Sequence, residues 1–172
     1  TDAKISKSCL DKCLLDAVNA SFNRITVDGD TSTNDACTLT ATQKADMPEI
    51  NDVNSHAYKL FSTAVKEMML DLAQKIIRDG EGATKFVSIF VEGGRDSEEC
   101  LQVANTVALS PLVKTALFAS DPNWGRILAA VGRAGIEGLD IEALKIFLGD
   151  VCIVENGRRS ASYTEEAGQA VM

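Results

Sequence analysis

Three short segments carry side chains whose types and spacing could do chemistry. The loop 28–35 (DGDTSTND) consists of acidic, hydroxylic, amide and glycine residues, and Glu81 stands between two glycines. The segment 121–126 (DPNWGR) places an acid, an amide and an arginine around the single tryptophan. Each segment also has a structural explanation: a self-satisfied turn, a solvated residue after a helix, and a capped helix start with Trp124 packed beneath it.

The loop begins like a calcium-binding loop but lacks the positions that complete one. Asp28, Asp30 and Ser32 match the first three ligand positions. The sixth position, which needs glycine for a sharp turn, is Thr33, and the twelfth, which needs a bidentate glutamate, is Leu39. We therefore expect no metal ion in this loop.

Sulfur and imidazole ligands also fail to form a recognisable set. Cys9 and Cys13 lie one helical turn apart and could share a metal, but the single histidine, His56, completes no ligand set. Packing of both thiols in a core is the favoured interpretation. Every Ser-His-Asp or Cys-His mechanism would depend on His56, and no pattern near it suggests a triad.

Composition restricts the function classes further. The chain has 172 residues, 17 lysines and arginines against 25 aspartates and glutamates, a net charge of −8 and 45% apolar residues. These values are typical of a globular chain and not of a disordered one. The acidic balance argues against nucleic acid or an anionic membrane as a partner. Five scattered cysteines and the absence of a membrane-length apolar stretch favour a reducing, cytoplasmic setting.

The pattern of apolar residues predicts an α/β fold, with long helices packed on mixed sheets in one domain, 1–172. We expect a capping box at Ser8 with Asp11, and Asp121 as a helix cap with Pro122 at the first helical position. The expected helices begin at about 8, 54, 96, 121 and 163, and the expected strands are 22–27, 37–42, 85–91, 141–147 and 151–154.

The chain resembles the ornithine acetyltransferase family in five segments that occur in the family's order. They are TDAKIS, SFNRITVDGDTSTND, DGEGATKFVSIFVEG, LVKTALFASDPNWGRILAAVGRAGI and YTEEAGQAVM. The family comprises the bifunctional enzymes of arginine biosynthesis, also called glutamate N-acetyltransferases. The resemblance spans essentially the whole chain, and FNRITVDGDTSTND and SDPNWGR are its most specific motifs.

The resemblance implies a self-processing enzyme with an N-terminal-nucleophile-like fold. One precursor cuts itself into an α chain and a β chain, and the new N-terminal threonine of the β chain is the nucleophile. It takes an acetyl group from N-acetylornithine and passes it to glutamate, and some members also use acetyl-CoA as a co-substrate. The present chain resembles most of a β chain, truncated at both ends, that needs its α chain in an α2β2 assembly and no further cofactor.

This chemistry does not need histidine, because an N-terminal α-amine can act as the base for a threonine hydroxyl at neutral pH. The resemblance places the nucleophilic threonine just upstream of Thr1, which matches a later threonine of the family. It assigns substrate binding to Glu81, whose carboxylate could pair with a substrate ammonium group. Ser32, Thr33 and Asn34 are candidates for lining the site, whereas we favour a structural role for 121–126.

Two alternatives come from other interpretations of the same residues. The chain could be a non-catalytic association module that completes the sheet of a partner, in which case no cleavage junction would be encoded upstream of Thr1. It could instead belong to a related self-processed amidase or aminopeptidase with water as the acceptor. Detection of acetyl transfer to glutamate, instead of net hydrolysis, would separate that enzyme from an acetyltransferase.

Overall fold

The computed structural model describes all residues, 1–172, and its contacts divide the chain into two compact units. Unit 1 is Thr1–Gly82 and unit 2 is Ala83–Met172, and each is described by itself. Six α-helices and one three-stranded sheet confirm the predicted α/β class. No helix combines the length and the apolar character needed to span a membrane. The expectation of a single domain stays a prediction, because clustered contacts do not show whether the units fold separately.

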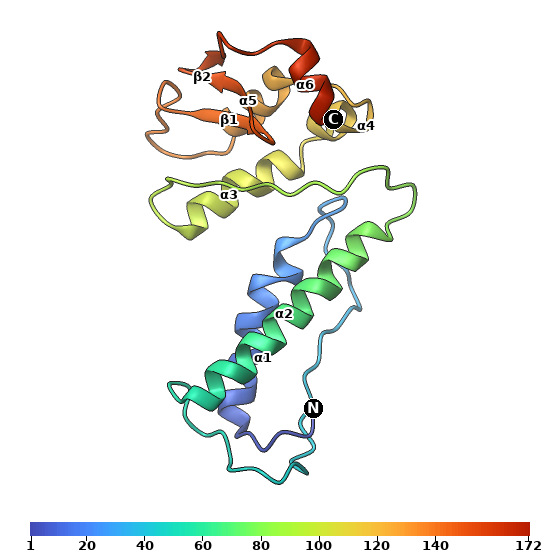
Figure 1. Cartoon of the computed structure of the whole chain (residues 1–172), viewed down its shortest axis with the longest axis vertical. Helices are drawn as coiled ribbons and strands as arrows, with labels where there is room; N and C mark the ends of the chain where they lie inside the picture. Colours follow the sequence, from blue (N-terminus) through green and yellow to red (C-terminus); the bar gives the residue numbers. More distant parts are fainter. The chain divides into compact units, whose positions relative to one another are not determined.

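Unit 1 is built on two helices that run side by side in the same direction (Figure 1). They are α1 (Lys7–Ala20) and α2 (His56–Arg78), and the short 3-10 helix η1 (Phe22–Arg24) follows α1. Two neighbouring helices can be parallel only if the chain returns to the starting end between them. Residues 25–55 make that return without any regular helix or strand.

The facing sides of α1 and α2 form the core of unit 1. Cys9 and Cys13 are 1% and 0% exposed within it, so their predicted role as packing residues is confirmed, and burial raises the pKa of the Cys13 thiol. The buried members of this core are Ile5, Cys9, Cys13, Ala17, Ile50, Tyr58, Val65 and Met69.

The capping box expected at Ser8 is wrong, because α1 begins earlier. Ser6 is the cap, and its Oγ accepts a hydrogen bond from the Cys9 amide at 3.3 Å. Ser6 stays extended because its amide donates to the Ile50 carbonyl at 2.9 Å, in a bridge that pairs Ile5 with Ile50. This pairing fixes the last extended residue, and the helix begins immediately after it.

The strands predicted at 22–27 and 37–42 are wrong. The chain turns into η1 directly after α1, where the Arg24 amide donates to the Ser21 carbonyl at 2.9 Å. Residues 37–42 are extended but join no sheet. Their apolar alternation fits a strand, but a strand also needs a neighbour along its whole length, and residues 1–6 contact the return segment at separate points.

One glutamine side chain supplies the backbone pairing that is missing between these points. Gln43 Nε2 donates to the Ile5 carbonyl at 2.8 Å, and Gln43 Oε1 accepts from the Ile5 amide at 2.9 Å. The amide therefore pairs with both backbone groups of a residue that is 1% exposed. Gln43 itself adopts φ 63°, a left-handed conformation that is uncommon for a residue with a side chain.

Unit 2 combines three helices with an antiparallel sheet and a final helix (Figure 1). The helices are α3 (Ser97–Ala108), α4 (Pro111–Phe118) and α5 (Trp124–Gly132), the strands are β1 (Lys145–Leu148), β2 (Val151–Glu155) and β3 (Arg158–Arg159), and the last helix is α6 (Glu165–Val171). The cores contain Val103, Val107, Val113, Ala130, Val131 and Ala134 on the helices, and Ile153, Val154 and Tyr163 at the sheet.

The predicted hairpin around Gly149 is confirmed, with Lys145 opposite Glu155 and Leu148 opposite Val151. Its first strand begins four residues later than expected. The Asp140 carboxylate accepts from the amides of Glu142 and Ala143, which holds these residues in a turn.

Helix starts in unit 2 follow local side-chain caps. Asp96 caps α3 as predicted, and the hydrogen bond from the Glu99 amide lowers the pKa of its carboxyl. Asp121 does not cap α5. Asn123 does so, by accepting from the Arg126 amide at 3.0 Å, and Pro122 therefore lies before the helix. Asn123 lies two residues downstream of Asp121, and the two residue types are about equally favoured as caps, so residue type alone does not choose between them.

The central strand predicted at 85–91 is also wrong. This segment forms no ladder with β1, β2 or β3. Ile89 and Val91 pack against the helical core of unit 2, whereas Phe90 is 87% exposed. Apolar composition identified a segment that packs on one face, but the position in a sheet depends on strands that composition does not reveal.

Replacement of Gln43 by glutamate tests the side-chain pairing with Ile5. The new carboxylate can still accept from the Ile5 amide, but it loses the donor and faces the Ile5 carbonyl. We expect Gln43→Glu to lower the free energy of unfolding by about 1–3 kcal/mol at pH 7. Protonation restores a donor, so the folded-state pKa is raised above about 4.3 and the loss shrinks as pH falls through it.

Urea unfolding at pH 7 and pH 4 measures this effect. Gln74→Glu is the matched control, because Gln74 lies on α2 and makes no hydrogen bond with its side chain. Equal effects of the two substitutions at both pH values would show that the Gln43 pairing contributes nothing specific.

Replacement of Gly168 on α6 by alanine tests close packing in unit 2. A Cβ at this position would lie 2.6 Å from Tyr163 Oη and 2.9 Å from Pro122 Cβ. Alanine normally stabilises a helix interior by about 1 kcal/mol relative to glycine, but a clash of this kind costs about 1–3 kcal/mol. We expect Gly168→Ala to be destabilising in urea titration and Gly132→Ala, on open α5 surface, to be neutral or stabilising.

Candidate functional site

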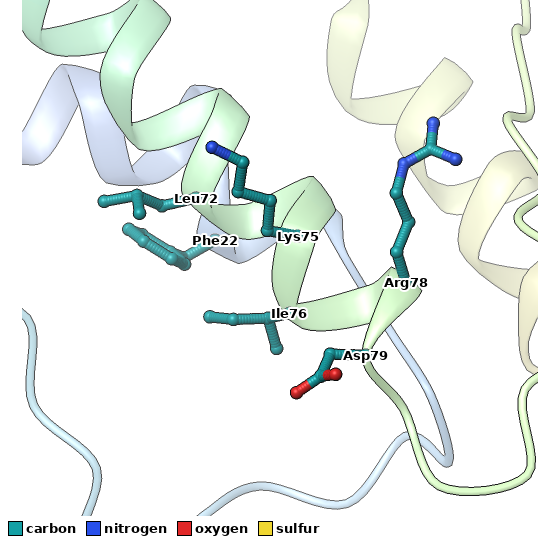
Figure 2. Close-up of a pocket in the computed structure, with 6 residues that line it drawn as sticks. All are labelled: Phe22, Leu72, Lys75, Ile76, Arg78 and Asp79. Atoms are coloured by element: carbon teal, nitrogen blue, oxygen red, sulfur yellow. The ribbon is translucent and has the colours of Figure 1, made fainter.

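A hollow of about 610 Å³ opens at the C-terminal end of α2 in unit 1 (Figure 2). In Figure 2 the side chains of Phe22, Leu72 and Ile76 extend to the same side of the helix end. The other lining residues, Lys75, Arg78 and Asp79, are charged, and the Arg78 guanidinium is turned away from the three apolar side chains. The hollow therefore combines an apolar wall with charges of both signs.

The hollow exists because α2 is longer than the helix that packs beside it. α1 ends at Ala20, and α2 continues to Arg78 with Phe22 beside its last turns. Leu72 and Ile76 remain 45% and 55% exposed there, which is unusual for large apolar side chains near one another. A ligand or a second chain with an apolar part could cover this wall.

Two of the charged residues also have a structural explanation. Lys75 and Arg78 lie in the last turn of α2, where cations interact favourably with the helix dipole. Lys75 Nζ forms an ion pair with Asp71 at 2.6 Å, in the i, i+4 arrangement common on exposed helices. Asp79 carries the opposite charge at the helix end, and its amide donates to the Lys75 carbonyl at 3.0 Å.

The hollow lies where two of the segments that carry the family resemblance begin. Phe22 is the second residue of SFNRITVDGDTSTND, and Asp79 is the first residue of DGEGATKFVSIFVEG. The fold of unit 1 therefore brings the starts of these two segments together, although Phe22 and Asp79 are 57 positions apart in the sequence. Neither Phe22 nor Asp79 was singled out from the sequence. A signal was present in the sequence, because each residue lies within two positions of the end of a helix and at the start of a specific motif.

Glu81 follows α2 in an exposed turn, two residues after Asp79. Its carboxylate forms no hydrogen bond or ion pair within the chain. Gly82, the next residue, has φ 69°, so the turn uses the freedom that glycine provides. A carboxylate in this position is available to a cationic partner, and substrate binding by Glu81 stays a prediction.

The hydroxyl-rich loop is exposed and satisfies part of its own hydrogen bonding. Ser32 Oγ accepts from the amides of Asn34 and Asp35 at 3.3 and 3.2 Å, which closes a local turn. The Thr33 hydroxyl makes no hydrogen bond within the chain. None of Ser32, Thr33 and Asn34 lines the hollow. Their role in a site stays a prediction, with Thr33 the least engaged of the three.

Thr1 is tied to its neighbours by local hydrogen bonds. Its nitrogen donates to the Thr40 carbonyl at 3.0 Å, and its Oγ1 accepts from the Ala3 amide at 3.2 Å. These contacts belong to the pairing of residues 1–6 with the return segment. A nucleophilic threonine upstream of Thr1 stays a prediction.

The contacts of residues 121–126 join helices and fill a core. Arg126 Nη1 donates to the Leu112 carbonyl and to Thr115 Oγ1, both at 3.1 Å, and so joins α5 to α4. Trp124 packs against the core at the sheet. The structural role favoured for 121–126 fits these contacts.

Other candidate sites in the structure are weaker. A second hollow of about 480 Å³ lies on α3 beside Arg133 and has a mixed polar and apolar wall. It involves none of the residues singled out from the sequence. No group of three or more histidine, cysteine, aspartate or glutamate side chains is arranged to hold a metal ion.

Comparison with known proteins gives one consistent result. The sequence model of the ArgJ family matches residues 1–172. The chain is 60% identical over 172 residues to the arginine biosynthesis bifunctional protein ArgJ of Pseudomonas fluorescens (strain Pf0-1), and 55% identical to that of Methylococcus capsulatus. Its fold is similar to the crystal structure of the Bacillus halodurans protein of the same name, with a TM-score of 0.90 and 37% identity.

The share of the aligned protein that this chain covers differs between the sequence matches and the structural match. The whole chain aligns with the Pseudomonas and Methylococcus proteins but spans 42% of their length. The structural match covers 98% of this chain and 78% of the Bacillus chain.

Proposed function

Because this chain belongs to the ArgJ family, we propose that it is part of an acetyltransferase of arginine biosynthesis. In this proposal it forms most of the β chain, which works with an α chain cut from the same precursor. The enzyme moves an acetyl group from N-acetylornithine to glutamate, and acetyl-CoA is an alternative donor. The observation that carries the proposal is the family match over residues 1–172.

The proposed reaction proceeds through an acyl-threonine. The threonine oxygen attacks the acetyl carbon, the carbon–nitrogen bond of N-acetylornithine breaks, and the leaving amine takes a proton. The amine of glutamate then attacks the ester and receives the acetyl group, which regenerates the hydroxyl. An α-amine at the same threonine can act as the base in both steps. The ester intermediate divides one difficult transfer into two easier ones.

Glu81 supplies the chemistry that this chain itself contributes. N-acetylornithine carries a side-chain ammonium group, and glutamate arrives with an α-ammonium group that must lose a proton before it attacks the ester. The exposed, unpaired carboxylate of Glu81 can bind either group, while it is protonated, with a charge-assisted hydrogen bond. The opposite charge of the substrate would compensate that of Glu81 and fix the orientation of the amino acid. The neighbouring hollow, with its apolar wall, could accept an aliphatic chain next to that charge.

Exposed apolar side chains support the partner chain in the proposal. The extended segment 85–91 has no neighbouring strand, and Phe90 is almost fully exposed on it. On α2, Leu60, Met68, Leu72 and Ile76 are also exposed. Surfaces of this kind are typical of chains that fold against a partner. The same observation favours the second candidate, a non-catalytic association module, so activity has to separate the two.

The first experiment measures acetyl transfer by the complete, self-processed protein. We expect N-acetylglutamate to form from N-acetylornithine and glutamate, with ornithine released in equal amount. Net release of acetate without transfer would favour an amidase, and absence of both products would favour the association module. Mass spectrometry of the purified chains identifies the cleavage site and the threonine at its new N-terminus.

Substitution of Glu81 tests the assigned binding group. We expect Glu81→Ala to raise KM for N-acetylornithine and for glutamate by about 10–100-fold, because a hydrogen bond to a charged group contributes about 1.5–3 kcal/mol. Self-cleavage should be unchanged, since Glu81 binds substrate and does not take part in processing. Glu67→Ala, an exposed acid on α2, is the matched control. Equal kinetics for Glu81→Ala and Glu67→Ala would contradict the assignment.

A further inference from the structure

The turn between β2 and β3 is built by an asparagine followed by a glycine. Asn156 and Gly157 have φ angles of 53° and 69°, so both lie in the left-handed region. They stand between Glu155 and Arg158, which face each other in the ladder of the two strands. A two-residue turn with two left-handed residues is a type I′ turn, and asparagine followed by glycine is a strongly preferred sequence for it.

The same pair of residues favours a chemical change of the asparagine. Glycine has no side chain, so its backbone nitrogen can approach the side-chain carbon of the preceding residue without hindrance. Asn156 is the one asparagine of the chain that a glycine follows. It is exposed, and its side chain makes no hydrogen bond within the chain. Asn156 therefore combines a reactive sequence with a side chain that no contact holds.

The chemical change is deamidation through a cyclic imide. The Gly157 nitrogen loses its proton to a base in the solvent and attacks Asn156 Cγ, so that the N–Cγ bond forms, the Cγ–Nδ2 bond breaks and the leaving nitrogen takes up a proton as ammonia. Water then opens the ring. Attack of water at Cγ gives aspartate with the original main chain. Attack at the backbone carbonyl carbon gives isoaspartate, whose main chain runs through the former side chain.

The folded turn opposes the first step of this reaction. Ring closure places the Gly157 nitrogen beside the Asn156 side chain, which requires rotation about the Asn156 Cα–C bond away from the left-handed turn. The paired strands on both sides restrict this rotation. The turn is also closely packed, because a Cβ at Gly157 would lie 3.1 Å from Ile141 Cγ2. Deamidation therefore requires the turn to open.

Arg159 holds the strand that has to move when the turn opens. Its Nη2 donates to the Tyr163 carbonyl at 3.2 Å, and its guanidinium carbon lies 5.1 Å from the centre of the Tyr163 ring, in a cation–π arrangement. Tyr163 is 4% exposed and so provides a fixed support. The side chain of Arg158, by contrast, is exposed and makes no hydrogen bond or ion pair within the chain. The second of the two arginines therefore fixes β3.

We infer that Asn156 is a deamidation site that the turn between β2 and β3 protects: it reacts when the turn opens, and the isoaspartate product prevents the turn from closing again. Isoaspartate adds one carbon to the main chain between Glu155 and Arg158, so a two-residue turn no longer joins them in the same register. The modification then releases β3 and weakens the contact of Arg159 with Tyr163. The inference does not depend on the proposed function, and all these residues lie in unit 2.

Peptide mapping by mass spectrometry, after incubation of the complete protein at mildly alkaline pH, tests the inference. The reference is a synthetic peptide of residues 152–160, which has the same sequence and no packed turn. We expect Asn156 to deamidate at least about tenfold more slowly in the folded protein than in the peptide, because only the open fraction of the protein reacts. Equal rates, or a peptide that keeps its amide, would overturn the inference.

Arg159→Ala tests the support of the turn. Loss of the cation–π contact and of the hydrogen bond to Tyr163 favours the open turn, so we expect deamidation to be about fivefold faster than in the unaltered protein. Arg158→Ala is the matched control, because it removes the neighbouring arginine, whose side chain has no partner. Both variants are also measured as peptides to correct for sequence. Equal corrected rates for the two variants would contradict the protective role of the turn.

Urea concentrations below the unfolding transition provide the test if Arg159→Ala does not fold. The deamidation rate of the unaltered protein should rise with urea towards that of the peptide in the same solution, because denaturant favours the open turn. A rate that stays constant relative to the peptide would show that Asn156 reacts in the closed turn. The isoaspartate fraction should also unfold at lower urea than Asn156→Asp, which keeps the original main chain. Equal midpoints would show that the product leaves the turn intact.

Discussion

Backbone amide and carbonyl groups away from water need partners, and both units depend on how this need is met. In unit 1 the helices α1 and α2 are parallel, so residues 25–55 must return to the end where the helices start. This return segment has no neighbouring strand to pair with. Separate bridges and the Gln43 side chain supply the pairing instead. In unit 2 the antiparallel hairpin pairs internally, whereas segment 85–91 joins no strand ladder and packs through Ile89 and Val91.

The candidate site depends on the two helices of unit 1. Because α2 outlasts α1, a partly apolar hollow remains at its end, and the two motif segments start on its wall. The Glu81 turn that follows is open and unneutralised. An exposed carboxylate beside apolar surface is suited to a cationic, partly aliphatic ligand, and this is the kind of substrate that the proposed reaction uses. The family membership of the chain and the chemistry of the turn therefore support the same proposal.

Strained and half-buried polar groups in unit 2 have a common location. Ser120, with its left-handed backbone, and the half-buried Lys85 contact each other, and α6 contacts Ser120 through Gln169. Conformational strain and charge burial both cost stability, so a site that contains both depends on its hydrogen bonds. By contrast, Arg126 and Trp124, which looked chemically interesting in the sequence, join helices and fill a core.

Local patterns in the sequence were sufficient for the helices α1, α2 and α3, the cap at Asp96, the hairpin around Gly149 and the packing of Cys9 and Cys13, because helices, caps and tight turns depend on residues close in the chain. The motifs also indicated the family and Glu81 as a candidate. Only the tertiary structure decided that 22–27, 37–42 and 85–91 are not strands, that Ser6 is the cap of α1, and that Phe22 meets Asp79 at one hollow. These features depend on partners distant in sequence, and the spacing of apolar residues along one segment carries no information about which partner lies beside it.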